Sequence, residues 1–169
     1  MSVLGAVLAG GASRRFGSDK ALAEWRGLPL IAHVIDRLRP QVGALVVVGR
    51  DHPGEVSIPD RPLPGLGPLG GLNAALHHAR DAGFDAVLTS GCDLPRLPRD
   101  LREELGAGPA YVAGQPLLGL WPAELAPLLD LHLRSSADRS LRGWIALVGA
   151  RAVDLGTVLN VNRPDDLPR

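Results

Sequence analysis

A glycine-rich stretch near the N-terminus, Leu8–Lys20, carries the residue types needed to hold a phosphate group. Gly10 and Gly11 lack a Cβ atom, so they can adopt positive φ angles and bring backbone N–H groups close to a ligand. Basic and hydroxyl side chains follow within the reach of one loop: Ser13, Arg14, Arg15 and Lys20. This combination predicts a loop that binds an anion. For the glycine pair alone, an ordinary strand-to-helix turn with solvated arginines is the alternative.

Lys20 is the only lysine among the 18 lysine and arginine residues of the chain. A compact ammonium group fits between phosphate oxygens in a way that a planar guanidinium does not. The placement of this lysine at the end of the glycine-rich stretch therefore favours phosphate binding. The stretch is not a P-loop, because Ser18 follows Gly17, and it is not the dinucleotide fingerprint, because Gly10 and Gly11 are adjacent.

A second candidate site follows the apolar run Asp85–Ser90, which is predicted to be a buried strand. Asp93 lies just beyond the carboxyl end of this run, which is where open α/β sheets bind ligands. Mg²⁺ is commonly held by one or two carboxylates together with phosphate oxygens. Asp93 is therefore predicted to bind Mg²⁺, and a simple structural turn is the alternative.

Strands and helices alternate along the chain, and they must bring these two regions together. Apolar runs predict strands at Val3–Leu8, Ala44–Val48, Val56–Ile58, Asp85–Ser90, Ala110–Ala113, Leu117–Trp121 and Ala152–Leu155. Helical spacing of apolar residues predicts helices at Leu30–Leu38, Pro68–Gly83, Pro98–Leu105, Pro122–Leu133 and Asp138–Val148. The alternation predicts a three-layer α/β fold with a mostly parallel central sheet, in a single domain over residues 1–169.

Composition excludes several other classes of protein. The 169 residues carry a formal net charge of zero, which gives no indication of a nucleic-acid-binding surface. Cys92 is the only cysteine, so an intramolecular disulfide and a multi-cysteine metal site are both excluded. No apolar run reaches about 18 residues, and no basic segment precedes an apolar one at the N-terminus. We therefore expect no membrane span, no secretory signal and a cytoplasmic protein.

The remaining conspicuous side chains are predicted to be structural. His77 and His78 are adjacent, so they cannot share one helix face, and a solvated role is favoured over metal binding. The three tryptophans are predicted to anchor the core or a partner surface: Trp25, Trp121 and Trp144.

The stretch Leu8–Lys20 resembles the LAGGxSxRxGxDK signature loop of the nucleotidyltransferases, in the form found in the molybdenum cofactor guanylyltransferases. Four further segments resemble motifs of this family and occur in the same order. They are Gly67–Leu72 (GPLxGL), Cys92–Pro95 (CDxP), Pro116–Trp121 (PLxxLW) and Asn160–Leu167 (NxNxPxDL). The resemblance implies a Rossmann-like nucleotidyltransferase fold of the α/β/α type.

The resemblance also implies an activity, a cofactor and a set of site residues. The activity is transfer of GMP from Mg-GTP to the terminal phosphate of molybdopterin or of the molybdenum cofactor, which forms molybdopterin guanine dinucleotide and releases pyrophosphate. Arg15, Lys20 and Asp93 are implied as catalytic, with Asp93 binding Mg²⁺. The implied nucleotide-binding residues are Leu8, Ala9, Gly10, Gly11, Lys20, Asp60 and Asp93. Asn160 and Asn162 are implied on the acceptor side, with turn residues as the alternative.

Two positions depart from the family pattern. Gly49 stands where close relatives can carry an asparagine that touches the nucleotide, and Gln115 replaces a histidine before the PLxxLW segment.

Three alternative functions stay open: a cytidylyltransferase, a sugar-phosphate nucleotidyltransferase, and an adaptor domain that binds GTP without turnover. Transient contacts with other cofactor-biosynthesis proteins and with recipient molybdoenzymes are also expected from the family.

Overall fold

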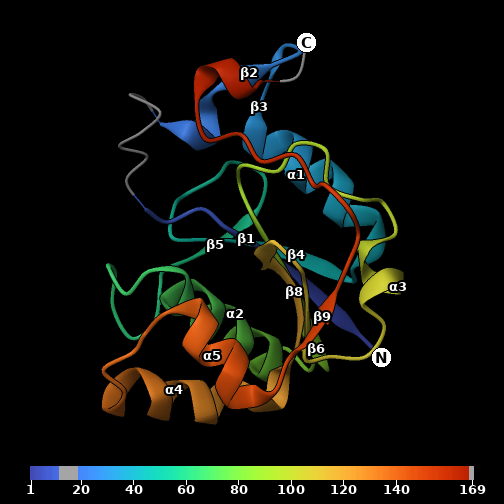
Figure 1. Cartoon of the computed structure of the whole chain (residues 1–169). Helices are drawn as coiled ribbons and strands as arrows, with labels where there is room; N and C mark the ends of the chain where they lie inside the picture. The colour runs from blue at the N-terminus through green and yellow to red at the C-terminus, as the bar shows by residue number, and fades with distance from the viewer. Residues whose placement is uncertain (12–18, 168–169) are drawn as a thin grey trace.

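The computed structural model describes residues 1–11 and 19–167, and it is built around a seven-stranded sheet (Figure 1). The strand order across this sheet is β5-β4-β1-β6-β8-β7-β9. The strands are β1 (Val3–Leu8), β4 (Ala44–Val48), β5 (Val56–Ile58), β6 (Ala86–Gly91), β7 (Ala110–Val112), β8 (Gln115–Pro122) and β9 (Arg151–Val153). A separate two-stranded ribbon pairs β2 (Glu24–Trp25) with β3 (Leu28–Pro29).

Five α-helices and four short 3-10 helices lie among the described residues. The α-helices are α1 (Leu30–Leu38), α2 (Pro68–Asp81), α3 (Leu101–Leu105), α4 (Ala126–Ser135) and α5 (Leu141–Val148). The 3-10 helices are Lys20–Leu22, Arg39–Gln41, Ala123–Leu125 and Pro164–Asp166. No helix in these described ranges has the length and apolar character needed to cross a membrane.

The middle of the sheet is parallel, as predicted, and its register aligns the carboxyl ends of the strands. Leu8 of β1 pairs with Val48 of β4 on one side and with Gly91 of β6 on the other. Val48 pairs in turn with Ile58 of β5. The chain therefore leaves four neighbouring strands at one edge of the sheet, and the segments that follow these strands lie close together.

The two faces of the sheet are covered by different helices, which gives the predicted three layers. On one face, Val3 and Val7 of β1 pack in a core with residues of α1 and α3. On the other face, Leu4 and Ala6 pack in a core with residues of α2 and α4 and with Trp144 of α5. Figure 1 shows α1 and α3 on one side of the sheet and α2, α4 and α5 on the other. Residues of β1 are thus buried on both faces, which explains its unbroken apolar sequence.

One strand on the far side of the sheet, β8, runs in the opposite direction to its neighbours. β8 runs antiparallel to both β6 and β7, whereas β9 is parallel to β7. A two-residue turn joins β7 to β8, and Gly114 in this turn has a φ of 80°, a value that glycine adopts readily. The sheet is therefore mostly parallel, and among its seven strands β8 alone runs opposite to the others.

Four predicted helices have different boundaries in the structure, and the first of them, α2, ends at Asp81 rather than Gly83. Helix α5 begins at Leu141 rather than Asp138, because the Ser140 hydroxyl accepts a hydrogen bond of 3.0 Å from the Gly143 N–H and caps the helix there. Pro122 belongs to β8, so the predicted helix from this residue is a 3-10 helix followed by α4. Helix α3 covers only Leu101–Leu105 of the predicted segment.

Candidate active site

Gly49, Gly10 and Asp60 form a tightly packed group at the carboxyl edge of the sheet. Gly49 leaves β4 with a φ of 88°, and a methyl group there would lie 2.6 Å from the Gly10 Cα and 3.2 Å from the Asp60 Oδ1. A methyl group on Gly10 would lie 3.3 Å from the Asp60 Oδ2. Glycine at position 49 is therefore required by both backbone conformation and space, so an asparagine does not fit here.

The two glycines of the predicted phosphate loop serve different purposes. Gly11 has a φ of 128°, as the sequence predicted. Gly10 does not adopt a positive φ, and it is needed instead for its close approach to Gly49 and Asp60. Ala9, immediately before them, continues from β1 and donates a backbone hydrogen bond of 2.9 Å to the Val48 carbonyl. The predicted nucleotide-binding run Leu8–Gly11 therefore lies along the carboxyl edge of the sheet.

The segment that carries Asp60 is hydrogen-bonded to the first turn of α2. The Arg61 N–H donates to the Gly70 carbonyl at 3.0 Å, and a methyl group on Gly71 would lie 3.5 Å from the Asp60 Oδ1. A cavity of about 270 Å³ opens beside Asp60, with Arg50 among the residues that line it. Burial raises the pKa of the Asp60 carboxyl above its usual value. The structure therefore places this carboxylate at the carboxyl edge, beside open space.

Lys20 and Asp93 form an ion pair at the same edge. The Lys20 Nζ lies 3.0 Å from the Asp93 Oδ2, and the two side chains are only 14% and 17% exposed. The Lys20 Nζ also donates a hydrogen bond of 3.2 Å to the Asn162 Oδ1. Three segments that are far apart in the sequence therefore meet at one ammonium group.

The backbone on either side of Asp93 fixes its carboxylate. A methyl group on Gly91 would lie 2.7 Å from the Asp93 Oδ1, so the side chain folds back over the end of β6 where glycine leaves room. The Asp93 carbonyl accepts a hydrogen bond of 2.9 Å from the Val161 N–H. Val161 is fully buried and packs with Trp25 and Leu30. This packing places the Asn160–Asn162 segment beside Asp93.

Asn160, in the same segment, has a buried polar atom. Its Oδ1 atom is buried and has no hydrogen-bond partner among the described residues. A buried amide oxygen is costly to leave unpaired, which makes Asn160 a candidate for contact with a bound polar group. Asn162 meets the Lys20–Asp93 pair through its amide oxygen, and Asn160 lies two residues before it; their acceptor-side role stays a prediction. Arg15, the other predicted catalytic cation, lies outside the described residues.

Cys92 precedes Asp93 and packs against the core. Burial, and secondarily the charge of Asp93, raises the pKa of its thiol to about 11. A thiol with this pKa is almost entirely protonated near neutral pH, so Cys92 is not a nucleophile. It is a partly buried thiol that packs against the hydrophobic core.

One contact in this region has no counterpart in the sequence motifs. Arg50, which follows Gly49, donates to both carboxylate oxygens of Asp19, and the Nη1 to Oδ1 distance is 2.8 Å. The hydrogen bond from Arg50 lowers the pKa of Asp19, and the same hydrogen bond raises the pKa of Arg50. Asp19 before a helical turn could be recognised as a cap, but nothing in the sequence pairs it with Arg50.

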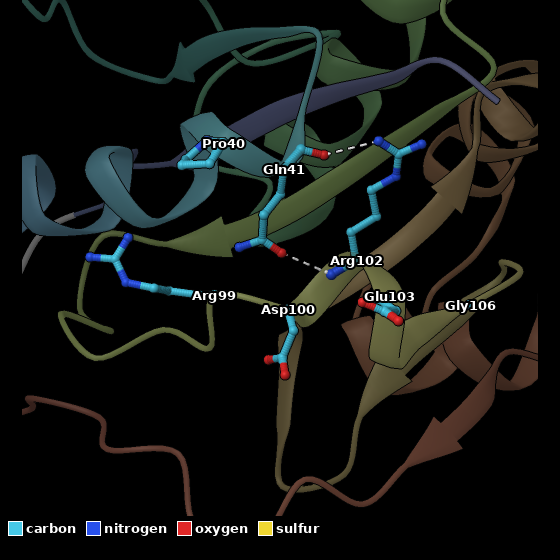
Figure 2. Close-up of a pocket in the computed structure, with 7 residues that line it drawn as sticks. All are labelled: Pro40, Gln41, Arg99, Asp100, Arg102, Glu103 and Gly106. Atoms are coloured by element: carbon cyan, nitrogen blue, oxygen red, sulfur yellow. Dashed lines mark hydrogen bonds between the residues drawn. The ribbon is translucent and has the colours of Figure 1, made fainter.

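Another cavity, of about 390 Å³, lies away from this edge (Figure 2). The Gln41 Oε1 accepts a hydrogen bond of 2.9 Å from the Arg102 backbone N–H, and the Arg102 guanidinium donates to the carbonyls of Gln41 and Met1. Met1 precedes β1, so this cavity is near the amino end of that strand. Ligands of open α/β sheets bind at the carboxyl ends, so the Lys20–Asp93 region is the better candidate.

Among residues 1–11 and 19–167, no cluster of three or more His, Cys, Asp or Glu side chains could hold a metal ion. A metal bound at this site would have the Asp93 carboxylate as a ligand and would take its other oxygen ligands from amides, water or a bound phosphate chain. Mg²⁺ is commonly bound in this way. The oxygen donors of Asp93 and Asn162, both within 3.2 Å of one cationic group, fit a hard divalent ion.

Comparison with known proteins places this chain in a family. Residues 5–153 match the MobA-like NTP transferase domain. The molybdenum cofactor guanylyltransferase of Rhodobacter capsulatus is 36% identical over 184 residues, which cover 100% of this chain and 95% of the relative. That of Sinorhizobium fredii is 38% identical and covers 95% of this chain and 87% of the relative.

Solved structures share the fold. Molybdopterin-guanine dinucleotide biosynthesis protein A from Archaeoglobus fulgidus gives a TM-score of 0.76 at 24% identity, and the match covers 97% of this chain and 94% of that one. A Mycobacterium tuberculosis protein solved as a complex with manganese gives a TM-score of 0.64 at 18% identity, over 98% and 96% of the two chains. The chain described here belongs to the MobA-like NTP transferases and, among them, to the family of the molybdenum cofactor guanylyltransferases.

Proposed function

We propose that this protein transfers GMP from Mg-GTP to the terminal phosphate of molybdopterin, forming molybdopterin guanine dinucleotide and releasing pyrophosphate. The observation that carries the proposal is the meeting of Lys20, from the glycine-rich stretch, with Asp93 and Asn162 at the carboxyl edge of the sheet. The full-length relatives named molybdenum cofactor guanylyltransferase support the choice of GTP and of the pterin acceptor.

Lys20 and Arg15 would neutralise the triphosphate. The Lys20 ammonium lies against the Asp93 carboxylate. A bound triphosphate offers Lys20 a more highly charged anion, and fixed cationic donors are worth more in such a partly desolvated site than in water. Lys20 is thus already held at the place where negative charge accumulates during the reaction.

Asp93 would hold the divalent ion, with Mg²⁺ as the proposed metal. A bound divalent ion offsets charge on the phosphate that is transferred. The manganese complex of the Mycobacterium tuberculosis neighbour supports a divalent ion in this fold. Asn162, whose amide oxygen faces the same ammonium group, is the described residue best placed to assist on the acceptor side.

The reaction requires positioning rather than a general base. An oxygen of the acceptor's terminal phosphate forms a bond to the α-phosphorus of GTP, and the bond from that phosphorus to the bridging oxygen of pyrophosphate breaks. A phosphate monoester is already ionised near neutral pH, so no side chain must remove a proton from the nucleophile. The site agrees with this, since the Cys92 thiol is protonated and Asp93 is engaged with Lys20. In-line alignment of the two phosphates supplies much of the rate.

The base and the acceptor would occupy opposite sides of the Lys20–Asp93 pair. The backbone of Leu8, Ala9 and Gly10 lies near Asp60, and this group is proposed to receive the guanine nucleoside. Asn160, with its unpaired buried amide oxygen, and Asn162 are proposed to face the pterin. Transient contacts with proteins that make or receive the cofactor are part of the same proposal.

The decisive experiment is pyrophosphate release by the purified protein with molybdopterin and Mg²⁺, offering GTP, CTP, ATP and UTP separately. Release with GTP alone, abolished by Lys20→Ala and by Asp93→Asn, supports the proposal. Release with CTP instead would overturn the base assignment while keeping the mechanism. GTP binding without turnover would favour the adaptor function.

A further inference from the structure

The ion pair between Arg50 and Asp19 links the end of the glycine-rich stretch to the central sheet. The Arg50 Nη1 and Nη2 donate to the Asp19 Oδ1 and Oδ2 respectively, which makes the pair bidentate. The side chains are 23% and 43% exposed. Bidentate arginine–carboxylate pairs fix orientation as well as distance, because the guanidinium is planar and its donors are rigidly spaced.

Asp19 transmits this fixed orientation to Lys20. The Asp19 Oδ1 also accepts a hydrogen bond of 3.2 Å from the Ala21 N–H, and the Asp19 carbonyl accepts one of 3.1 Å from the Leu22 N–H. Asp19 is therefore the N-cap of the 3-10 helix Lys20–Leu22. Lys20 is the first residue of that helix, so a carboxylate held by Arg50 also determines where the Lys20 side chain begins.

The consecutive residues Gly49 and Arg50 contact both flanks of the glycine-rich stretch. Gly49 packs directly on the Gly10 backbone, with no room for a methyl group between them. Arg50 then binds Asp19 on the other flank. Both residues follow β4, which is part of the rigid sheet. One short segment beyond a strand thus anchors the two ends of the stretch that supplies the phosphate-binding groups.

We infer that Arg50 is a positioning residue. Through its bidentate ion pair with Asp19, it holds Lys20 at Asp93 before the nucleotide arrives. This preorganisation strengthens nucleotide binding. The inference rests on the proposed function, because it concerns the affinity of that same site. The advantage is preorganisation: a cation already in place loses less conformational freedom when the triphosphate binds. Arg50 acts through Asp19, so its effect depends on the Asp19 carboxylate.

A double-mutant cycle tests this dependence directly. Equilibrium binding of each Mg-NTP is measured for the unmodified protein, for Arg50→Met, for Asp19→Asn and for the double variant, and thermal unfolding confirms that each is folded. We expect each single change to weaken GTP binding about tenfold and the double change to be no worse than either. Arg50→Lys keeps the positive charge but not the two rigidly spaced donors of the guanidinium. This variant is expected to bind GTP more tightly than Arg50→Met and less tightly than the unmodified protein. In turnover assays, the KM for GTP rises more than kcat falls.

Arg39→Met supplies the matched control. Arg39 pairs with Glu55 in another arginine–carboxylate ion pair, and neither residue belongs to the site. Its loss is expected to leave GTP binding unchanged. If Arg39→Met weakened binding as much as Arg50→Met, the effect would come from net charge and the inference would be wrong.

Other outcomes separate this inference from the proposed function. Unchanged affinity in Arg50→Met overturns the inference alone, and so does an Arg50 effect that persists in the Asp19→Asn background, because Arg50 would then touch the nucleotide itself. Binding of CTP rather than GTP, with the same coupling between Arg50 and Asp19, overturns the proposed preference for guanine. It still supports the positioning role of Arg50. No binding of any nucleotide to the unmodified protein overturns both.

Discussion

At the scale of single residues, the two acidic side chains of the site have opposite environments. Asp93 faces the Lys20 ammonium at 3.0 Å. Asp60 instead lies against the backbone of Gly10 and Gly49, where burial raises its pKa. Burial of a carboxylate in this way disfavours its charged form and therefore costs stability near neutral pH. Such a cost is common where a charge is kept for binding.

Replacing Asp60 by asparagine should therefore make the protein more stable and a weaker nucleotide binder. The pKa of Asp60 is higher in the folded chain than in the unfolded chain, so the folded chain binds more protons between the two values and stability falls as the pH rises through that window. Asp60→Asn removes this pH-dependent contribution to the free energy of unfolding. In urea unfolding at several pH values, the free energy of unfolding of the variant relative to that of the original protein should increase from acidic to neutral pH.

The same variant should bind Mg-GTP less tightly, because the asparagine amide offers the proposed guanine nucleoside one acceptor oxygen where the carboxylate offers two. A variant that was less stable at neutral pH than at acidic pH, relative to the original protein, would contradict the assigned environment of Asp60. Unchanged GTP affinity would remove Asp60 from the nucleotide site.

Cys92 should react slowly with alkylating reagents in the folded protein. Its pKa of about 11 leaves roughly a thousandth of the thiol ionised at pH 8, and only the thiolate reacts. Because it is the only cysteine, the rate of iodoacetamide labelling by mass spectrometry reports on this residue alone. The rate should rise about tenfold per pH unit up to about pH 10.

Unfolding in urea should bring the labelling rate up to that of a free thiol. Fast labelling of the folded chain at pH 7 would show that Cys92 lies in a more polar setting than the structure gives it.

At the scale of elements, the parallel strands were predictable and their partners were not. The apolar runs of β1, β4 and β6 indicated buried strands, because both faces of each strand are covered. The boundaries of α5 depended on one capping hydroxyl, that of Ser140. The antiparallel pairing of β8 with β6 depends on contacts between residues distant in sequence. Such pairings leave no mark in local periodicity.

The helix pair α2 and α4 shows a contact that the sequence also concealed. His77, predicted to be solvated, is only 16% exposed and its Nε2 lies 2.9 Å from the Asp130 Oδ2. The prediction was wrong because Asp130 comes from another helix and shields this histidine. The Asp130 Oδ1 also accepts a hydrogen bond of 2.8 Å from the fully buried Asn73 amide. Asp130 thus joins the two helices through polar contacts.

Removing Asp130 should destabilise the protein by about 1–3 kcal/mol, because the Asn73 amide would lose its carboxylate partner in a buried position. Burial opposes ionisation of Asp130, but the Asn73 hydrogen bond and the charges of His77 and Arg61 outweigh it and lower its pKa. The stabilisation from the Asp130 carboxylate is therefore present at pH values above the pKa of Asp130 in the unfolded chain. It is lost as the pH falls through the lower pKa of Asp130 in the folded chain. Urea unfolding of Asp130→Ala at neutral pH measures it.

Asp81→Ala is a suitable control, since Asp81 is exposed at the end of α2. It should change stability little. Equal losses in the two variants would mean that the Asn73–Asp130 contact contributes nothing specific.

At the scale of the whole molecule, the site is assembled from segments that only the sheet order brings together. The motifs identified Lys20, Asp93 and Asn162 one by one, and the structure joins them within 3.2 Å. The contact depends on β1 lying between β4 and β6, which no local pattern specifies. The Arg50–Asp19 pair was missed for the same reason. Sequence thus predicted the residues of the site better than their contacts.

Because distant segments form the site, a bound nucleotide should stabilise the entire fold. A ligand that binds only the folded chain adds RT ln(1 + [L]/Kd), or about 2.7 kcal/mol at a hundredfold excess over Kd. We expect Mg-GTP to raise the melting temperature measured by differential scanning fluorimetry, and GTP with EDTA to raise it less. Asp93→Asn should abolish the difference between these two conditions, because it removes the proposed carboxylate ligand of Mg²⁺.

Lys20→Ala separates the two charges of the site. It removes the ammonium and leaves Asp93 in place, so Mg²⁺ should still add to the stabilisation while the total shift becomes smaller. If Asp93→Asn kept the full difference between Mg²⁺ and EDTA, the metal would be held by other groups and Asp93 would serve only to position Lys20. If Lys20→Ala kept the full shift, the triphosphate would be bound elsewhere, and the meeting of these segments would be structural alone.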